Sequence, residues 1–422
     1  MKPLSIFQLL AVVVGAVGLT ITKYDEPNKN HLTARPVETR LVKAEFSLES
    51  NQSNTNQNRV SEDVRALVAL GSRVAGTPTT EKALAYLSQE YQKAGYITEV
   101  QSFTYDKFED RGSSLSIDGN TVSGRALNGS LPGNPTAPLV AVPNLGRTKD
   151  FAIVDVAGKI AVVKRGEIRF SEKAQNAVAA GAIGLIIVNN APNNFWGTLG
   201  ADIPIPVLSL GGERGAFLLE NTSENFSEVT LNVDTVRRSV TGRNLIARTA
   251  ESTQPQILLG GHYDSVSESP GANDNASGTA VVLDLARRLA QTDRARDVWF
   301  VAFDGEEDGL HGSRAFVEAA TPEFLSQLKG MVNFDMVGVN SELKVSGTAS
   351  LTNLMQSYPL FSIAGVRVGS DHIPFKNAGV PVLFLTRGLH PEYHTPEDIR
   401  VDPELLEETV RVGLKVTRQI LD

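Results

Sequence analysis

The sequence predicts an α/β fold in which helices cover a central sheet. Three continuous apolar runs, Ile257–Leu259, Val298–Phe303 and Val382–Leu385, are typical of central strands that are buried on both faces. They alternate with two amphipathic segments, Thr279–Leu289 and Leu405–Ile420, whose apolar residues recur at helical spacing. Strands that alternate with helices favour a layered sandwich of sheet and helices.

Length and composition exclude several classes of protein. The chain has 422 residues, enough for two or three domains. Its 41% hydrophobic and 21% charged residues are ordinary for a globular protein. A net charge of −8 without a basic run argues against a nucleic acid or an anionic membrane as partner. Because the chain has no cysteine, thiol nucleophiles, disulfides and thiolate metal sites are excluded, and His, Asp and Glu remain as the main metal ligands.

The N-terminal segment differs in composition from the rest of the chain. An apolar stretch, Ile6–Ile21, follows Lys2, and its glycines and β-branched residues suit an export signal better than a soluble helix. We expect residues 1–22 to be a signal peptide or an uncleaved membrane anchor, and the protein to be exported to the periplasm or the extracellular space. Residues 23–59 are polar and contain eight uncharged polar residues in a row, which predicts a flexible linker.

The folded part is expected to begin near Val60. Apolar residues in Glu81–Gly95 recur at helical spacing and the segment ends in a glycine, which predicts a helix. In the middle of the chain, the apolar runs Lys159–Val163 and Gly184–Val188 lie on either side of the helix-like segment Ser171–Ala180. We therefore expect a strand–helix–strand unit there.

The first polar cluster follows the apolar run that begins at Ile257. His262 and Asp264 are two residues apart, so they share a face of an extended strand. An imidazole that binds a metal commonly donates its other N–H to a carboxylate. His262 is therefore a candidate metal ligand with Asp264 as its orienting partner, and a His–Asp surface pair is the alternative.

The second cluster, GANDNASG at residues 271–278, opens the predicted helix Thr279–Leu289. Asp274 then lies at the positive end of the helix dipole, where a carboxylate stays ionised and can bind cations. The alternative interpretation is a helix cap formed by Asn275 or Ser277.

The third cluster, FDGEEDGLHGS at residues 303–313, follows a predicted central strand. Glu306 and Glu307 are flanked by Asp304 and Asp308, so four carboxylates occur within five residues. Carboxylates this close raise one another's pKa unless a cation offsets their charge. A solvated acidic loop is the alternative, and the preceding apolar strand makes it less favoured.

The fourth group lies further along the chain, with Asp335 in NFDMVG and Tyr393 and His394 in YHTPED. Together the four groups supply two imidazoles and several carboxylates from successive strand ends, where open α/β sheets place their sites. Such a set suits two zinc ions about 3.5–4 Å apart, whereas calcium and magnesium prefer oxygen ligands. A remaining carboxylate would be the general base for water.

Read in order, the motifs H-x-D, N-D-N-x-S-G, G-E-E, N-F-D-M-V-G and Y-H-T-P-x-D resemble those of the co-catalytic zinc aminopeptidases of the aminopeptidase Y and bacterial leucyl aminopeptidase type. The resemblance spans about Val60 to Asp422. It implies a three-layer zinc-exopeptidase sandwich with a mixed central sheet, and two Zn²⁺ per chain. Carried over residue by residue, it implies His262 and Asp335 on one zinc, Glu307 and His394 on the other, Asp274 bridging both, Glu306 as general base, Asp264 as partner of His262, and Tyr393 as a donor to the oxyanion.

The middle of the chain resembles a protease-associated (PA) domain, with Gly158–Asn190 as the best-matching stretch. This resemblance implies an inserted domain that shapes or covers the cleft. We accordingly expect a first catalytic part at 60–134, the PA domain at 135–235 and a second catalytic part at 236–422.

The same resemblance implies hydrolysis of N-terminal residues from peptides by a metal-activated water. An acidic cleft suits the cationic terminus of a peptide, which favours an aminopeptidase over a carboxypeptidase of the same fold. Glutaminyl cyclases, which are transferases with a single zinc, are the other alternative. A receptor-like module is disfavoured because every ligand is present, and a serine hydrolase because no G-x-S-x-G motif occurs. The expected partners are peptides with a free N-terminus, with membrane contact only through the N-terminal segment; no oligomeric state is predicted.

Overall fold

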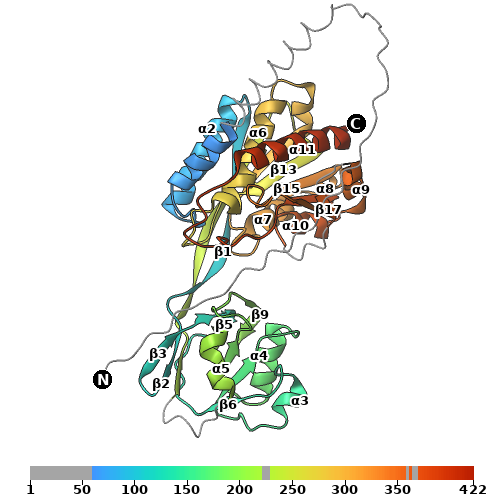
Figure 1. Ribbon diagram of the computed structural model, residues 1–422. Coiled ribbons are helices and arrows are strands. Elements are labelled where there is room, and N and C mark those ends of the chain that lie inside the picture. Colours follow the sequence, from blue (N-terminus) through green and yellow to red (C-terminus); the bar gives the residue numbers. More distant parts are fainter. Residues whose placement is uncertain (1–58, 221–228, 358–360, 364–368) are drawn as a thin grey trace, which may run out of the picture. The chain divides into compact units, whose positions relative to one another are not determined.

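The computed structural model describes residues 59–220, 229–357, 361–363 and 369–422 (Figure 1). The predicted signal or anchor and the predicted linker lie outside the described residues, except for Arg59, which is helical together with residues 60–69. Within the described ranges, none of the helices combines the length and the apolar character that a membrane span requires.

A mixed sheet of eight strands forms the centre of the larger part of the structure. In spatial order the strands are β1 (Ile97–Asp110), β12 (Thr235–Arg248), β14 (Val298–Phe303), β13 (Ile257–His262), β15 (Gly330–Phe334), β18 (Val382–Thr386), β16 (Leu343–Gly347) and β17 (Phe361–Ile363). The neighbours β14, β13, β15 and β18 run parallel, while β12 and β16 pair antiparallel at their two sides. The three apolar runs are therefore central strands, as predicted.

Helices cover both faces of this sheet. They are α2 (Pro78–Lys93), α6 (Gly278–Leu289), α7 (His311–Ala319), α8 (Pro322–Ser326), α9 (Ala349–Thr352), α10 (His372–Asn377) and α11 (Pro403–Leu421), with short helical turns η2 (Ala272–Ser277), η3 (Asp293–Asp297) and η4 (Asn353–Ser357). Successive residues of β13 point to opposite faces: Ile257 and Leu259 pack in one core with apolar residues of α2, α6 and α11, whereas Leu258 packs with Phe316 of α7 and Phe375 of α10. The predicted three-layer sandwich is confirmed.

The helix α11 lies close against α6. A Cβ atom on Gly413 of α11 would come within 2.9 Å of the Leu285 side chain of α6 and 3.2 Å of the Phe334 ring. Glycine at this position allows the helix backbone to approach both. The contact holds α6, whose N-terminal end carries a candidate ligand loop, against the centre of the sheet.

The strands β1 and β12 form a long antiparallel ribbon from Ile97↔Arg248 to Asp110↔Thr235. The part of the sequence between these two strands forms a second group of sheets. Its elements are β2 (Ser114–Ile117), β3 (Asn120–Ser123), β4 (Arg125–Ala126), β5 (Asn128–Ser130), β6 (Leu139–Ala141), α3 (Thr148–Phe151), β7 (Ile160–Lys164), α4 (Phe170–Ala179), β8 (Gly184–Val188), β9 (Thr198–Ile203), β10 (Val207–Leu210), α5 (Gly212–Glu220) and β11 (Val229–Asn232). The segment β7–α4–β8 is the predicted strand–helix–strand unit, in a five-stranded sheet of order β4-β10-β8-β7-β6.

Strand pairing also shows which early residues join this second group. The strand β4 pairs with β10, and β2 pairs with β11. Residues 114–130 therefore share sheets with residues 198–232, although the sequence-based division assigns them to the first catalytic part. The exact domain limits remain a prediction.

Candidate active site

The residues selected from the sequence gather at one edge of the large sheet. The parallel strands β13, β14, β15 and β18 end there, so the segments that follow them meet. His262 is the last residue of β13 and Asp264 follows it, Glu306 and Glu307 follow β14, Asp335 follows β15, Tyr393 and His394 follow β18, and Asp274 lies in η2 at the entrance to α6.

The carboxylate of Asp274 lies between two imidazoles. Its Oδ1 is 3.2 Å from Nε2 of His262, and its Oδ2 is 3.2 Å from Nε2 of His394. The two histidines are far apart in the sequence, and each faces a different oxygen of one buried side chain. This arrangement is what a carboxylate that bridges two cations requires.

Each histidine also faces a second carboxylate. Asp335 Oδ1 is 3.4 Å from His262 Nε2, and Glu307 Oε2 is 3.0 Å from His394 Nε2. A tetrahedral zinc ion with bonds of about 2.0–2.1 Å spaces its ligand atoms about 3.3–3.4 Å apart. The observed separations fit that spacing.

Two groups of side chains offer ligand atoms within 4.8 Å of one another, His262 with Asp274 and Glu307, and His262 with Glu306 and Asp335. Glu307 Oε1, Asp335 Oδ1 and His394 Nε2 are buried and make no hydrogen bond among the described residues. Buried polar atoms are normally satisfied, so these atoms need another partner. A donor set of imidazole and carboxylate fits zinc.

The surroundings of the candidate ligands shift the pKa values of their side chains strongly. Burial raises the pKa of Glu306 well above its ordinary range, and that of Glu307 to about 7. Burial alone would lower the pKa of His394, but its contacts with Asp274 and Glu307 outweigh this and raise the pKa to about 10. Without another cation, the crowded carboxylates hold protons on the imidazoles.

Asp264 contacts both the first histidine and the loop that carries the two glutamates. Its Oδ1 is 3.3 Å from Nδ1 of His262. The backbone N–H groups of Glu306 and Glu307 donate to its two oxygens, at 3.2 and 3.3 Å. Asp264 therefore orients the imidazole so that Nε2 faces the carboxylates, and it also fixes the glutamate loop, a second contact that the sequence did not predict.

The loop of Asp274 is held by a residue that sequence reasoning missed. The backbone N–H groups of Asn273 and Asp274 donate to the two oxygens of Asp398, at 2.9 and 3.1 Å. Asn275 accepts from the backbone N–H of Gly278 at 2.8 Å and donates to Phe334 O at 2.9 Å. The cap by Asn275 is therefore present together with the site, and Asp398, the last residue of YHTPED, could have been suspected from its place in that motif.

Tyr393 lies beside the second histidine. Its ring stacks on that of His394, with centroids 3.8 Å apart and an angle of 20° between the planes. Burial, followed by the charges of Asp274, Glu307 and Asp335, raises the pKa of Tyr393. The phenol therefore keeps its proton and can donate a hydrogen bond.

Two further buried residues near the site were not selected from the sequence. Arg73 is fully buried and donates to the backbone carbonyls of Tyr263, Pro270 and Gly271, so it holds the segment between His262 and Asp274. Asp371 is also fully buried, and burial raises its pKa to about 7. Arg73 lies in no motif, and Asp371 lies in the segment SDHIPF, residues 370–375, from which no ligand was selected.

Two family models match the chain. The model described as peptidase family M28 matches residues 244–416, and the model described as PA domain matches residues 135–218. Aminopeptidase YwaD of Bacillus subtilis is 34% identical over 361 residues, which cover 78% of this chain and 76% of that protein. The chain belongs to peptidase family M28. The resemblance stated from the motifs, including the PA domain, is confirmed.

Solved structures of similar proteins agree with the fold. The aminopeptidase from Aneurinibacillus sp. strain AM-1 superposes with a TM-score of 0.73 at 30% identity, over 87% of this chain and 95% of that one. BSAP, a zinc aminopeptidase from Bacillus subtilis, gives a TM-score of 0.72 at 32% identity, over 86% and 94% of the two chains. The M28 chain described here therefore shares its architecture with these enzymes over nearly their whole length.

Proposed function

We propose that this M28 peptidase is a two-zinc aminopeptidase that removes N-terminal residues from peptides. The observation that carries the proposal is the Asp274 carboxylate, whose two oxygens each face a different imidazole at 3.2 Å. Its relatives bear the name aminopeptidase, and one solved relative is a zinc aminopeptidase, which supports the class of metallo-aminopeptidase predicted from the sequence.

The side chains divide into two groups around Asp274. His262 and Asp335 would hold one zinc, and Glu307 and His394 the other, with Asp274 shared. When bound, a zinc pair supplies a lowered pKa for a water molecule and polarisation of the scissile carbonyl. The spacing of 3.0–3.4 Å between paired ligand atoms supports this division.

Glu306 is proposed as the general base. Its Oε2 is 4.0 Å from Nε2 of His262, so it lies beside the ligands without being as close as Asp335. Burial raises its pKa, which suits a group that takes a proton from water and then passes it to the leaving amine. Such proton transfer typically contributes about 10²–10⁴ in rate. Tyr393 would donate to the oxyanion that develops on the carbonyl oxygen.

The peptide terminus that enters the site is proposed to be the amino end. The described side chains around the metal site are mainly carboxylates, and a protonated amine is attracted to such surroundings. A carboxypeptidase would instead need a cationic group directly beside the metal ligands to meet the carboxylate of the residue that is removed, and the buried Arg73 there already donates to three backbone carbonyls. Glutaminyl cyclisation with one zinc remains the alternative that metal counting distinguishes.

Export is also part of the proposal. It is supported by the apolar stretch Ile6–Ile21 and the polar segment that follows it, both outside the described residues. Fractionation of cells that produce the full chain tests it: activity retained in the cytoplasmic fraction would contradict export.

The decisive experiment combines zinc counting with a substrate panel. Purified enzyme is stripped with a chelator and titrated with zinc, and hydrolysis is followed on leucyl anilide and on peptides with free or acetylated N-termini. We expect two zinc ions per chain at full activity and no cleavage of acetylated peptides. Comparable rates on acetylated peptides, or full activity with one zinc and a cyclised product, would overturn the proposal.

Two matched variants sharpen this experiment. Asp274→Asn should lose both zinc ions and the activity, because it removes the shared carboxylate. Asp293→Asn makes the same chemical change at an exposed position of η3 and should behave like the wild type.

A further inference from the structure

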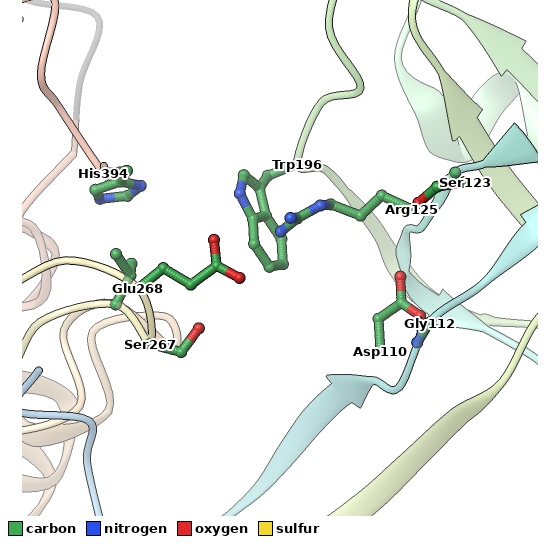
Figure 2. A pocket seen from close by; sticks show the side chains of 10 residues that line it. Asp110, Gly112, Ser123, Arg125, Trp196, Ser267, Glu268 and His394 are labelled. Carbon is green, nitrogen blue, oxygen red and sulfur yellow. Dashed lines mark hydrogen bonds between the residues drawn. The ribbon is translucent and has the colours of Figure 1, made fainter. Parts of the chain in front are cut away.

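A pocket of about 250 Å³ lies next to the predicted ligand His394, and Figure 2 shows it from close by. Glu268 lines one side, and Arg125 and Trp196, from the part of the chain between β1 and β12, line the other. We infer that Arg125 and Trp196 bind the part of a peptide that follows the scissile bond, and that Arg125 recognises a carboxylate there. This inference rests on the proposed aminopeptidase function.

The two residues form one binding surface. The guanidinium carbon of Arg125 lies 3.4 Å from the centre of the Trp196 ring, so the cation stacks on the indole. Trp196 is nevertheless 63% exposed, the second most exposed of the large hydrophobic residues described. Exposed aromatic rings paired with arginine are typical of binding surfaces, because both residue types dominate interface energies.

The surface is held in place before any ligand arrives. Asn194 donates to Ser123 O at 3.1 Å, which ties the segment before Trp196 to the segment before Arg125. Phe195 is buried and its ring stacks on Phe170, with centroids 5.0 Å apart. A rigid site loses less conformational freedom on binding, so more of the contact energy appears as affinity.

The guanidinium of Arg125 is available to a ligand. Among the described residues it makes no hydrogen bond and no ion pair. Its acidic neighbour Asp110 already accepts from the backbone N–H groups of Gly112, Ser113 and Ala126, and from the Ser113 hydroxyl. Glu268 points toward it from across the pocket in Figure 2, but is exposed to water, which screens its charge.

The chemistry of the Arg125 guanidinium favours a carboxylate as its ligand. An arginine stacked on an aromatic ring keeps its N–H groups in the plane of the guanidinium, and this planar fork matches two carboxylate oxygens. In the proposed reaction the N-terminal residue of the substrate lies at the metal ligands. The segment of the peptide that extends past His394 into the pocket is therefore the part after the scissile bond, which leaves as the product with a new N-terminus. Its carboxylate can be the C-terminus of a short peptide or the side chain of Asp or Glu.

A series of paired substrates tests the inference and shows whether the carboxylate comes from the C-terminus or from a side chain. Leu-Gly, Leu-Gly-Gly and Leu-Gly-Gly-Gly are compared with their C-terminal amides, and Leu-Asp-Gly amide with Leu-Asn-Gly amide. We expect a charged substrate to have a kcat/KM about tenfold higher than its neutral partner, mainly through a lower KM. This should hold either for the acid and amide of one peptide length or for the Asp and Asn pair. An effect limited to the C-terminal acids identifies the terminus as the ligand, and one limited to Asp identifies the side chain.

Three variants assign the effect to residues. Arg125→Gln should bring the charged-to-neutral ratio close to one, while Glu268→Gln should increase it because a competing negative charge is removed. Arg237→Gln is the matched control, since Arg237 also lies over an aromatic ring, that of Phe108, but does not line the pocket. The ratio compares two substrates on one protein sample, so partial unfolding of a variant cancels.

The outcomes separate this inference from the proposed function. A wild-type ratio near one for every pair, or a high ratio that survives in Arg125→Gln, would overturn the inference while the aminopeptidase assignment stands. Zinc-loaded wild-type enzyme that hydrolyses neither member of any pair would instead overturn the proposed function.

Discussion

Replacing Glu306 by glutamine tests how the carboxylates divide their roles. Both Glu306 and Asp335 face Nε2 of His262, and the three side chains could share an ion. Asp335 Oδ1 lies 3.4 Å from Nε2, whereas Glu306 Oε2 lies 4.0 Å from it. The shorter separation matches a tetrahedral ligand pair of about 3.3–3.4 Å, and the longer one does not. We therefore expect Glu306 to act on protons and Asp335 to bind the metal.

The magnitude follows from that assignment. Loss of a positioned general base should lower kcat about 10²–10⁴-fold, which corresponds to roughly 3–5 kcal/mol of activation free energy. Glutamine has nearly the same shape and carries no charge. Because burial raises the pKa of Glu306, the neutral amide removes the cost of a buried negative charge, and the melting temperature of the metal-free protein should not fall.

The assay measures zinc content and leucyl anilide turnover on the same preparations. Glu307→Gln is the contrast, because its side chain lies 3.0 Å from His394 Nε2 and should bind metal. We expect Glu306→Gln to keep two zinc ions and lose turnover, and Glu307→Gln to lose zinc and regain part of its turnover in excess zinc. Near-normal turnover in Glu306→Gln, or loss of zinc from it alone, would refute the reasoning.

Three other predictions concern the residues around the metal site. Zinc binding at pH 7 should release at least two protons and tighten as pH rises. Carboxylate contacts outweigh burial and raise the pKa of His262 and, to about 10, of His394, while burial raises that of Glu307 to about 7. Both imidazoles and part of the Glu307 population must therefore lose a proton, and calorimetry in different buffers would refute this if it found fewer than about two protons released. Asp264→Asn should weaken zinc affinity or activity about 10–100-fold, and an unchanged value in competition with a chelator would count against its orienting role. Arg73→Gln leaves three backbone carbonyls, two of them in buried contacts, without their donor. Denaturant titration should therefore show a free energy of unfolding lower by about 3 kcal/mol, and a loss below about 1 kcal/mol would contradict this.

The central sheet was predictable because its strands are buried on both faces. Such strands read as continuous apolar runs, and Val298–Phe303 has the same limits in the sequence-based prediction and in the structure. The helix predicted from Thr279 begins one residue earlier, at Gly278. In contrast, β1 was not predicted. Much of it is exposed in the ribbon it forms with β12, so its sequence lacks the run of apolar residues that marks a central strand.

The candidate ligands were predictable for a different reason. Imidazole and carboxylate groups at successive strand ends indicate a candidate metal site by residue type, whatever the exact backbone path. The supporting residues could not be found this way. Arg73 binds backbone carbonyls about 190 residues away in the sequence, and backbone carbonyls carry no signal in the residue letters. Trp196 could likewise not be selected from the sequence, because only the structure shows that it stacks with Arg125.

Two acidic residues outside the proposed ligand set explain how the site keeps its geometry. Asp264 accepts hydrogen bonds from the backbone N–H groups of Glu306 and Glu307. Asp398 accepts hydrogen bonds from those of Asn273 and Asp274. Each carboxylate uses both oxygens to fix a loop that carries a ligand, so the loops are positioned by the protein. These four hydrogen bonds join protein groups to one another, so they can position the loops without a metal contact, unlike in small zinc domains that unfold without their ion. Loops fixed in this way would hold the ligands, and with them a general base, at defined distances from a bound water.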